Sequence, residues 1–284
     1  MRGSAEEPGR ALEPGVYLCP TPLGNLGDIT LRALEVLRSA DIVAAEDTRH
    51  TRELLTAHGI ARTLRSLRRE NEQSLAPRLV AEALAGKSVA VVSDAGMPAL
   101  SDPGALLVRA AVDAGVKVTA LPGPSALPAA LAGSGLPASP CFFGGFLPRR
   151  ASERRRLLAR LTPLPATLVF FEAPHRILAS LEDLSSLWPE RQACLVRELS
   201  KLHEEWLRGT LASIREALVA RAKVLGEITL VVQGGSGSAP QPPAQPPDAS
   251  LPRRARALAR QAGISRHDAY LMLAGEDEKL PPGR

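Results

Sequence analysis

Residues 88–104 read SVAVVSDAGMPALSDPG, an apolar run followed by a loop of unusual composition. The run SVAVV is typical of a strand buried in a parallel sheet. The twelve residues after it hold two Asp, two Gly and two Pro. Gly permits close backbone approach, Pro stiffens the loop, and a carboxylate such as that of Asp94 can accept hydrogen bonds from hydroxyl or ammonium groups. The loop therefore predicts a small organic ligand rather than a triphosphate, and we expect Asp102 to cap the following helix.

Similar apolar runs recur upstream and downstream, at 16–19, 41–46 and 116–121. Helical patterns separate them at about 28–39, 48–58, 74–85 and 104–114. Strand and helix in alternation indicate a parallel α/β sheet. The loops at 20–25 and 121–127 also follow strands, and we expect all three loops at the carboxyl edge of the sheet, where open α/β sheets bind ligands.

A second series begins after the Gly/Pro-rich stretch at 133–140. We expect its strands at 166–172, 192–199 and 227–233 and its helices near 152–160, 174–187 and 209–222. The predicted fold class is α/β, with two α/β domains, a cleft between them and a small helical C-terminal extension. The predicted limits are a flexible N-terminus at 1–14, α/β domains at 15–137 and 138–233, a Pro/Gly/Ser linker at 234–250 and a basic helical domain at 251–284.

Composition narrows the class of protein. The chain has 284 residues and is 45% hydrophobic but only 3% aromatic, which favours sheets covered by helices. Its net charge of +5 is carried mostly by Arg, whose planar fork suits phosphate, although Arg-rich surfaces also occur without any ligand. The three distant cysteines predict neither a disulfide framework nor a metal site. With no apolar leader or membrane-length span, we expect a cytoplasmic protein without a membrane partner.

Standard nucleotide and hydrolase motifs are missing from the sequence. Gly86, Lys87 and Ser88 resemble the end of a P-loop, but Ala81 stands where the first glycine would be, and neither GxGxxG nor GxSxG occurs. Basic runs at 61–70 and 147–156 and the Arg-rich tail predict RNA contacts, with solvated helix faces as the alternative. The candidate RNA-binding residues are Arg65, Arg68, Arg69, Arg149, Arg150, Arg154, Arg155, Arg253 and Arg254.

Eight motifs together resemble the tetrapyrrole methylase-like (class III) S-adenosylmethionine-dependent enzymes. They are PTPLGNLGDITLRALEVL, EDTRHTRELL, SDAGMPALSDPG, LPGPSAL, GFLPR, FFEAPHR, RELSK and GEITLVVQG, spread in order over about 15–234. Among these enzymes the motifs are most similar to the branch that methylates the ribose 2′-oxygen of a cytidine in bacterial 16S ribosomal RNA. This resemblance implies S-adenosylmethionine in the cleft, a homodimer, and the 30S particle or its RNA as partner. The implied cofactor contacts are Pro22, Leu23, Asp94, Met97, Ser125, Ala126, Phe171, Glu172 and Glu227.

Transfer of a methyl group to a ribose hydroxyl needs a positioned base or orienting group. Polar clusters directly after the strands supply the candidates Glu46, Asp47, His50, His175 and Lys201, of which His50 and Lys201 are the first to test. Helix capping or surface pairing is the alternative role for each. Two other functions stay open: C-methylation of a tetrapyrrole, which the same fold allows, and RNA binding in ribosome assembly without catalysis.

Overall fold

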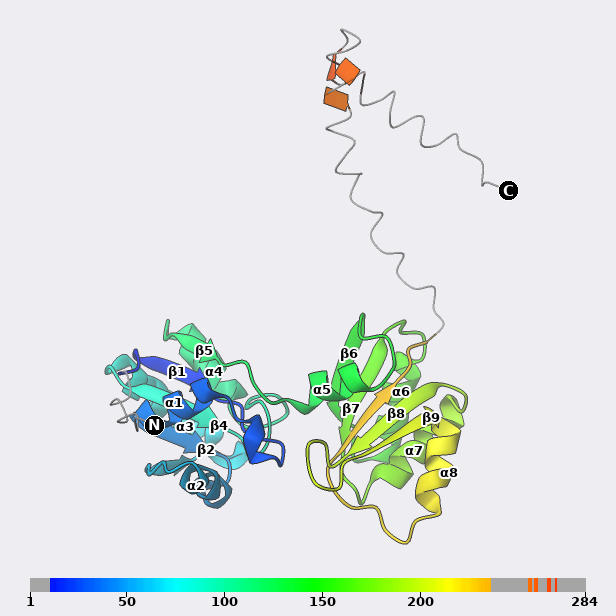
Figure 1. Cartoon of the computed structure of the whole chain (residues 1–284), viewed down its shortest axis with the longest axis horizontal. Coiled ribbons are helices and arrows are strands. Elements are labelled where there is room, and N and C mark those ends of the chain that lie inside the picture. The colour runs from blue at the N-terminus through cyan, green and yellow to red at the C-terminus, as the bar shows by residue number, and fades with distance from the viewer. Residues whose placement is uncertain (1–10, 236–254, 257, 260–264, 267–268, 270–284) are drawn as a thin grey trace, which may run out of the picture. The chain divides into compact units, whose positions relative to one another are not determined.

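The computed structural model describes residues 11–235, 255–256, 258–259, 265–266 and 269. The chain divides into two units, Met1–Gly235 and Ser236–Arg284 (Figure 1). In the second unit the described residues include a small cluster in which Leu258 packs against the buried Ala255, Ala259 and Ala269. Arg253, Arg254, most of the linker and the N-terminal ten residues lie outside the described part of the chain.

The first sheet is wholly parallel, as the alternating pattern predicts. Its strand order is β3-β2-β4-β1-β5. The strands are β1 (Gly15–Leu18), β2 (Ile42–Ala45), β3 (Leu64–Ser66), β4 (Ser88–Val92) and β5 (Val118–Ala120). Since β4, β1 and β5 are neighbours and run in the same direction, the three loops after them leave the same edge of the sheet, as expected.

Helices cover both faces of this sheet. They are α1 (Leu31–Ser39), α2 (Thr48–Ala57), α3 (Arg69–Leu84) and α4 (Ala105–Asp113). Alternation along β4 sends Ala90 and Val92 into one core with α1 and α2, and Val89 and Val91 into the other with α3 and α4. Burial on both sides explains why β4 is an uninterrupted apolar run.

The second sheet is mixed, with strand order β6-β7-β10-β8-β9. Only β6 and β7 are parallel, whereas β10 runs antiparallel to β7 and β8, and β9 antiparallel to β8. The expected strands are β7 (Thr167–Glu172), β8 (Gln192–Arg197) and β10 (Ile228–Val232). The edge strands β6 (Cys141–Phe146) and β9 (Glu205–Thr210) were not expected from the sequence.

Helices also pack on both faces of the second sheet. On one face α6 (Ala151–Leu161), α7 (Ile177–Leu187) and α8 (Leu211–Val219) contribute to a core that contains Leu158, Leu181, Ile214 and Phe170. On the other face lies α5 (Ala126–Gly133), whose Ala130 packs against Val169 and Val231 (Figure 1). The chain thus leaves the first sheet at β5 and contributes α5 to the second sheet before β6 begins.

Candidate active site

A cavity of about 380 Å³ lies where loops of the first sheet meet the second sheet. The loop after β4 contributes most of one wall, and residues of β7, β8 and β10 contribute the other. The lining residues are Leu23, Glu46, Asp94, Ala95, Gly96, Met97, Leu100, Ser101, Asp102, Ala126, Phe146, Phe171, Glu172, Ala173, Pro174, Val196, Leu199, Glu227, Ile228 and Thr229. The cavity therefore joins an apolar surface to several carboxylates.

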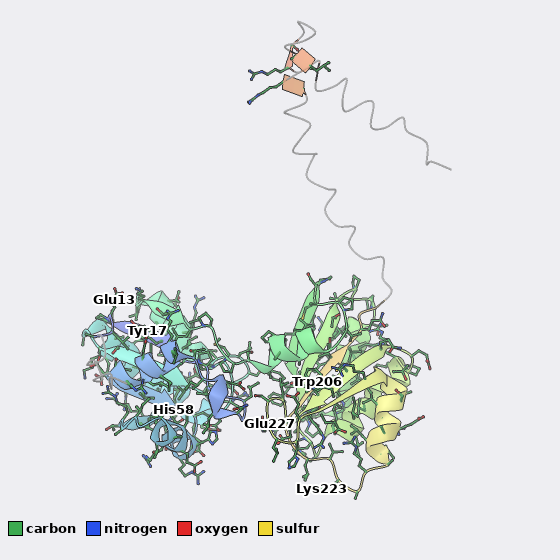
Figure 2. The ribbon with its side chains drawn as sticks, in the orientation of Figure 1. Glu13, Tyr17, His58, Trp206, Lys223 and Glu227 are labelled. Carbon is green, nitrogen blue, oxygen red and sulfur yellow. The ribbon has the colours of Figure 1, made fainter. Side chains whose placement is uncertain are left out.

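Most of the residues expected to contact the cofactor line this cavity. They are Leu23, Asp94, Met97, Ala126, Phe171, Glu172 and Glu227. Figure 2 labels Glu227, which stands directly before β10. Ser125 lines a neighbouring cavity of about 440 Å³ that shares Leu23 and Leu199 with the first. Pro22 is buried and lines neither cavity.

Three carboxylates gather in the cavity at the edge of the first sheet. Burial, reinforced by the charges of Asp102 and Asp94, raises the pKa of Glu46 to about 7. Burial also raises the pKa of Asp102 to about 6, with Asp94 adding to the effect and Arg69 opposing it. The Asp94 Oδ1 atom accepts the backbone N–H of Asp47 at 2.9 Å, which ties the loop after β4 to the loop after β2.

A buried glutamate fixes the start of α4, in place of the expected Asp102. The N-cap position is Gly104, which has no side chain to accept a hydrogen bond. Glu72, 5% exposed, supplies the acceptor from α3: its Oε1 receives the backbone N–H groups of Gly104, Leu106 and Leu107 at 2.8, 2.9 and 3.2 Å. Asp102 is thereby left to line the cavity.

The Glu172 carboxylate is held by its own neighbours. It is 2% exposed and accepts the Ser180 hydroxyl at 2.5 Å and the backbone N–H of Ala173 at 2.9 Å. The Arg176 guanidinium lies 3.3 Å from Oε1. These contacts occupy both oxygens and fix the turn after β7, so Glu172 shapes the wall of the cavity more than it offers a free carboxylate.

The structure separates the five candidates for the base. Glu46 alone among them lines the cavity. Asp47 caps α2 and binds Arg49 at 2.8 Å, and the hydrogen bond with that guanidinium lowers the pKa of Asp47. His50 is exposed on α2, and His175 is exposed in the turn after β7.

Lys201 serves as a bridge between loops. Its Nζ donates to Glu198 Oε1 at 3.0 Å and to Glu227 Oε2 at 3.2 Å. Burial alone would lower the pKa of Lys201, but these two carboxylates outweigh it and raise the pKa, so the amine is held charged. The aliphatic part of the Lys201 side chain packs against Gly24, where an added Cβ would lie only 2.3 Å from Lys201 Cγ.

The basic residues fall into different environments. Arg68 and Arg69 are exposed near the cavity, where Arg68 Nε lies 3.5 Å from the Glu46 carbonyl and Arg69 donates to the Ser101 carbonyl. Arg65 pairs with Glu82 at 3.1 Å. Arg149 and Arg150 are exposed after β6.

The structure argues against an RNA contact for Arg154. This residue is only 5% exposed, and its Nε donates to Asp183 Oδ2 at 2.7 Å inside the fold. A guanidinium already paired and excluded from solvent has no surface to present to phosphate. Arg155, on the same helix, keeps an exposed side chain while binding the other oxygen of Asp183 at 2.7 Å. The basic run at 147–156 is thus partly structural.

Several lining residues were not identified from the sequence. Phe146, Leu100, Ser101, Val196 and Leu199 line the cavity beside the expected residues. Ser101 belongs to the loop SDAGMPALSDPG and Phe146 to the motif GFLPR, so both residues lie in motifs from which the site was predicted. Among the described residues no group of His, Cys, Asp and Glu is arranged to hold a metal ion. The described helices include none long and apolar enough to cross a membrane.

Known proteins are similar to this chain over most of its length. Residues 15–215 match the family described as Tetrapyrrole (Corrin/Porphyrin) Methylases. A Mesorhizobium japonicum protein named ribosomal RNA small subunit methyltransferase I is 43% identical over 99% of this chain and 94% of its own length. A Xylella fastidiosa protein of the same name is 47% identical over 78% of this chain and 83% of its own length.

A solved structure of the same fold covers 78% of this chain and 98% of its own. It is a uroporphyrin-III C-methyltransferase from Thermus thermophilus, complexed with S-adenosylhomocysteine, and it matches with a TM-score of 0.53 at 20% identity. At that identity the likeness establishes the fold and leaves the substrate open.

Proposed function

Because the chain belongs to the tetrapyrrole (corrin/porphyrin) methylase family, we propose that it is an S-adenosylmethionine-dependent methyltransferase of small-subunit ribosomal RNA. Methylation of that RNA is the activity for which its curated relatives are named. The finer proposal is that the acceptor is the ribose 2′-oxygen of a cytidine. The observation that carries the proposal is the cavity, in which the carboxylates of Glu46, Asp94 and Asp102 lie among apolar side chains.

This cavity suits the methyl donor by charge and by surface. S-adenosylmethionine supplies a methyl group on a positively charged sulfur and also carries an ammonium group. Carboxylates favour such cations, and the family neighbour complexed with S-adenosylhomocysteine supports the same ligand class. Leu23, Met97 and Phe171 provide apolar area for the uncharged parts of the molecule. We assign Asp94 as the principal polar contact, because it stands at the end of β4 and is fixed by Asp47.

Glu46 is the proposed base. It follows β2 directly, lines the cavity, and has a pKa raised by burial to about 7, close to the value that makes a general base effective near neutral pH. In this role its carboxylate accepts the proton of the acceptor hydroxyl while the surrounding residues hold that oxygen in line with the methyl group. Of the other candidates, Lys201 becomes a positioning residue, because its amine is bound to Glu198 and Glu227.

The charge distribution favours RNA over a tetrapyrrole. Arg68 and Arg69 are exposed beside the cavity, and Arg149 and Arg150 are exposed after β6. Such residues attract a phosphate backbone, whereas the carboxylates inside the cavity repel the acidic side chains of a porphyrinogen. The acidic cavity disfavours a function as a non-catalytic assembly protein, since RNA binding alone does not need buried carboxylates.

Methyl incorporation decides among these functions. The full-length protein is incubated with radiolabelled S-adenosylmethionine in three parallel reactions. The acceptor is 30S particles in the first, naked 16S RNA in the second and a uroporphyrinogen in the third. We expect label in the RNA, and nuclease mapping with mass spectrometry should place it on a cytidine ribose. Label in the porphyrinogen would favour the tetrapyrrole alternative. If calorimetry detects no binding of S-adenosylmethionine, both enzymatic functions are contradicted. The proposed homodimer predicts a mass in light scattering of twice the 30.1 kDa chain.

A further inference from the structure

A β-bulge in β6 turns Phe146 toward the cavity. Phe142 packs with the core under α6 to α8, and Phe143 packs on the opposite face of the sheet with Val169. The register with β7 shifts between Phe143 and Gly145, so that Phe146 lies opposite Phe171. Regular alternation would have placed Phe146 on the same face as Phe142. The extra residue therefore moves its ring to the face where the cavity lies.

Two glycines make this bulge possible. A Cβ on Gly144 would stand 2.5 Å from the ring of Phe170, which fills the core of the second sheet. Gly145 has a φ of +62°, a conformation that other residues rarely adopt, and its Cα faces Ser101 of the loop after β4. The sequence GGF is thus built to bring an aromatic ring to one place beside that loop.

The ring so placed is left half uncovered. Phe146 is 50% exposed although it lines the cavity, while its neighbour Leu147 is 2% exposed. One edge of the aromatic group is supported: the rings of Phe146 and Phe171 are 5.7 Å apart at 66°, and Phe171 meets Phe143 in the same way at 5.0 Å. An aromatic ring supported on one side by another ring and exposed on the other can serve as a stacking platform for a planar group.

Charged groups in the cavity and close to Phe146 in the fold or along the chain match the parts of a nucleotide. Arg69 donates to the Ser101 carbonyl, next to Gly145, and Arg149 is exposed three residues after Phe146. These cations suit phosphates, and the carboxylate of Glu46 in the same cavity suits a ribose hydroxyl.

We propose that Phe146 is the platform on which a base of the RNA substrate stacks, next to the methyl donor. The assignment rests on the proposed function, since it concerns the same cavity. The Phe146 ring would then contact the RNA and not the cofactor. It lies at the exposed part of the wall, whereas Phe171, which packs against it, is more covered.

Three variants of the full-length protein test this role: Phe146→Ala, Phe146→Leu and Phe146→Tyr. Methyl transfer to 30S particles gives KM and kcat, and calorimetry gives the Kd for S-adenosylmethionine. Leu84→Ala, which truncates an exposed side chain on α3, is the matched control. We expect Phe146→Ala to raise KM for the particle about 5- to 150-fold, the range that loss of one stacked base produces. Phe146→Tyr should have a KM close to that of wild type, because it keeps an aromatic ring. Phe146→Leu should have a raised KM like that of Phe146→Ala, because Leu keeps apolar volume without a ring.

The outcomes separate the platform from the proposed function. Wild-type protein that methylates no RNA contradicts the function itself. If the wild type is active, two results overturn the platform alone: a KM in Phe146→Ala equal to that of wild type, or a KM in Phe146→Leu equal to that of wild type. A Kd for S-adenosylmethionine weakened as much as the KM for the particle also overturns it, because the ring would then belong to the cofactor site. Circular dichroism and the thermal midpoint verify that each variant is folded before the constants are compared.

Discussion

The sharpest prediction concerns the proton on Glu46. Its carboxyl is in the cavity with a pKa raised to about 7, chiefly by burial and further by the charges of Asp102 and Asp94. A base acts only when it is deprotonated, so methyl transfer should rise with pH as this carboxyl loses its proton. Bound cofactor carries positive charge and should draw the midpoint below the value of the free enzyme.

The size of the effect follows from that midpoint. Roughly a tenth of the protein is deprotonated one pH unit below the midpoint and roughly nine tenths one unit above, so the rate rises about tenfold across this interval wherever the midpoint falls. Glu46→Gln keeps the shape of the side chain but cannot take a proton. It should therefore lower the rate about 10²- to 10⁴-fold and remove the pH-dependent rise.

The assay is single-turnover transfer of labelled methyl groups to 30S particles from about pH 5.5 to 8.5. Cofactor binding is measured by calorimetry at each pH, so that a loss of affinity is not mistaken for a loss of the base. Asp102→Asn removes a repelling charge and should move the midpoint to lower pH. His50→Ala, exposed on α2, is the control and should keep the wild-type profile. A Glu46→Gln variant with normal rate and an unchanged profile would refute the reasoning.

Further predictions concern cofactor affinity and stability. Asp94→Ala should weaken S-adenosylmethionine about 10- to 100-fold in calorimetry, as expected for losing a hydrogen bond to a charged group, and unchanged affinity would contradict its assignment. Glu72→Ala leaves three N–H groups of α4 without their acceptor and should lower the free energy of unfolding in urea by about 2 kcal/mol. Arg154→Ala breaks the buried pair with Asp183 and should cost about 3 kcal/mol, whereas Arg150→Ala on the surface should change stability by less than about 0.5 kcal/mol; equal effects would contradict the burial argument.

The sequence predicted elements with strong periodicity and missed those without it. β4 was located to the residue because SVAVV is buried on both faces. β6 contains two adjacent glycines, and β9 alternates charged, aromatic and small residues at a sheet edge, so neither forms an apolar run. α5 was missed because ALPAALAG contains Pro and Gly and lacks a polar face.

Two charged residues on apolar helix faces indicate buried partners that were not predicted from the sequence. In α6 Arg154 is in line with the buried Leu158 and Leu161, and in α3 Glu72 is in line with the buried Ala76 and Leu79. A charge at such a position indicates a buried partner. The partners, Asp183 and the first turn of α4, lie far along the chain, so only the folded structure identifies them.

Of the site, the sequence located the loops but could not rank the side chains within them. Glu46 and Asp47 are adjacent, yet one lines the cavity and the other caps a helix, because the backbone turns from β2 into α2 between them. The distinction depends on a change of direction at a single residue, which no spacing rule encodes.

The continuous path of the chain has a thermodynamic consequence. Each sheet is built from one uninterrupted segment, with the crossing made once, between β5 and α5, and the cavity takes residues from both segments. A ligand that needs both walls binds only when both segments are folded, so it couples their unfolding into one event. At a cofactor concentration of about 100 times Kd this linkage adds about 2.7 kcal/mol. The concentration of the methyl donor would then set the stability of the folded enzyme as well as its rate of methyl transfer.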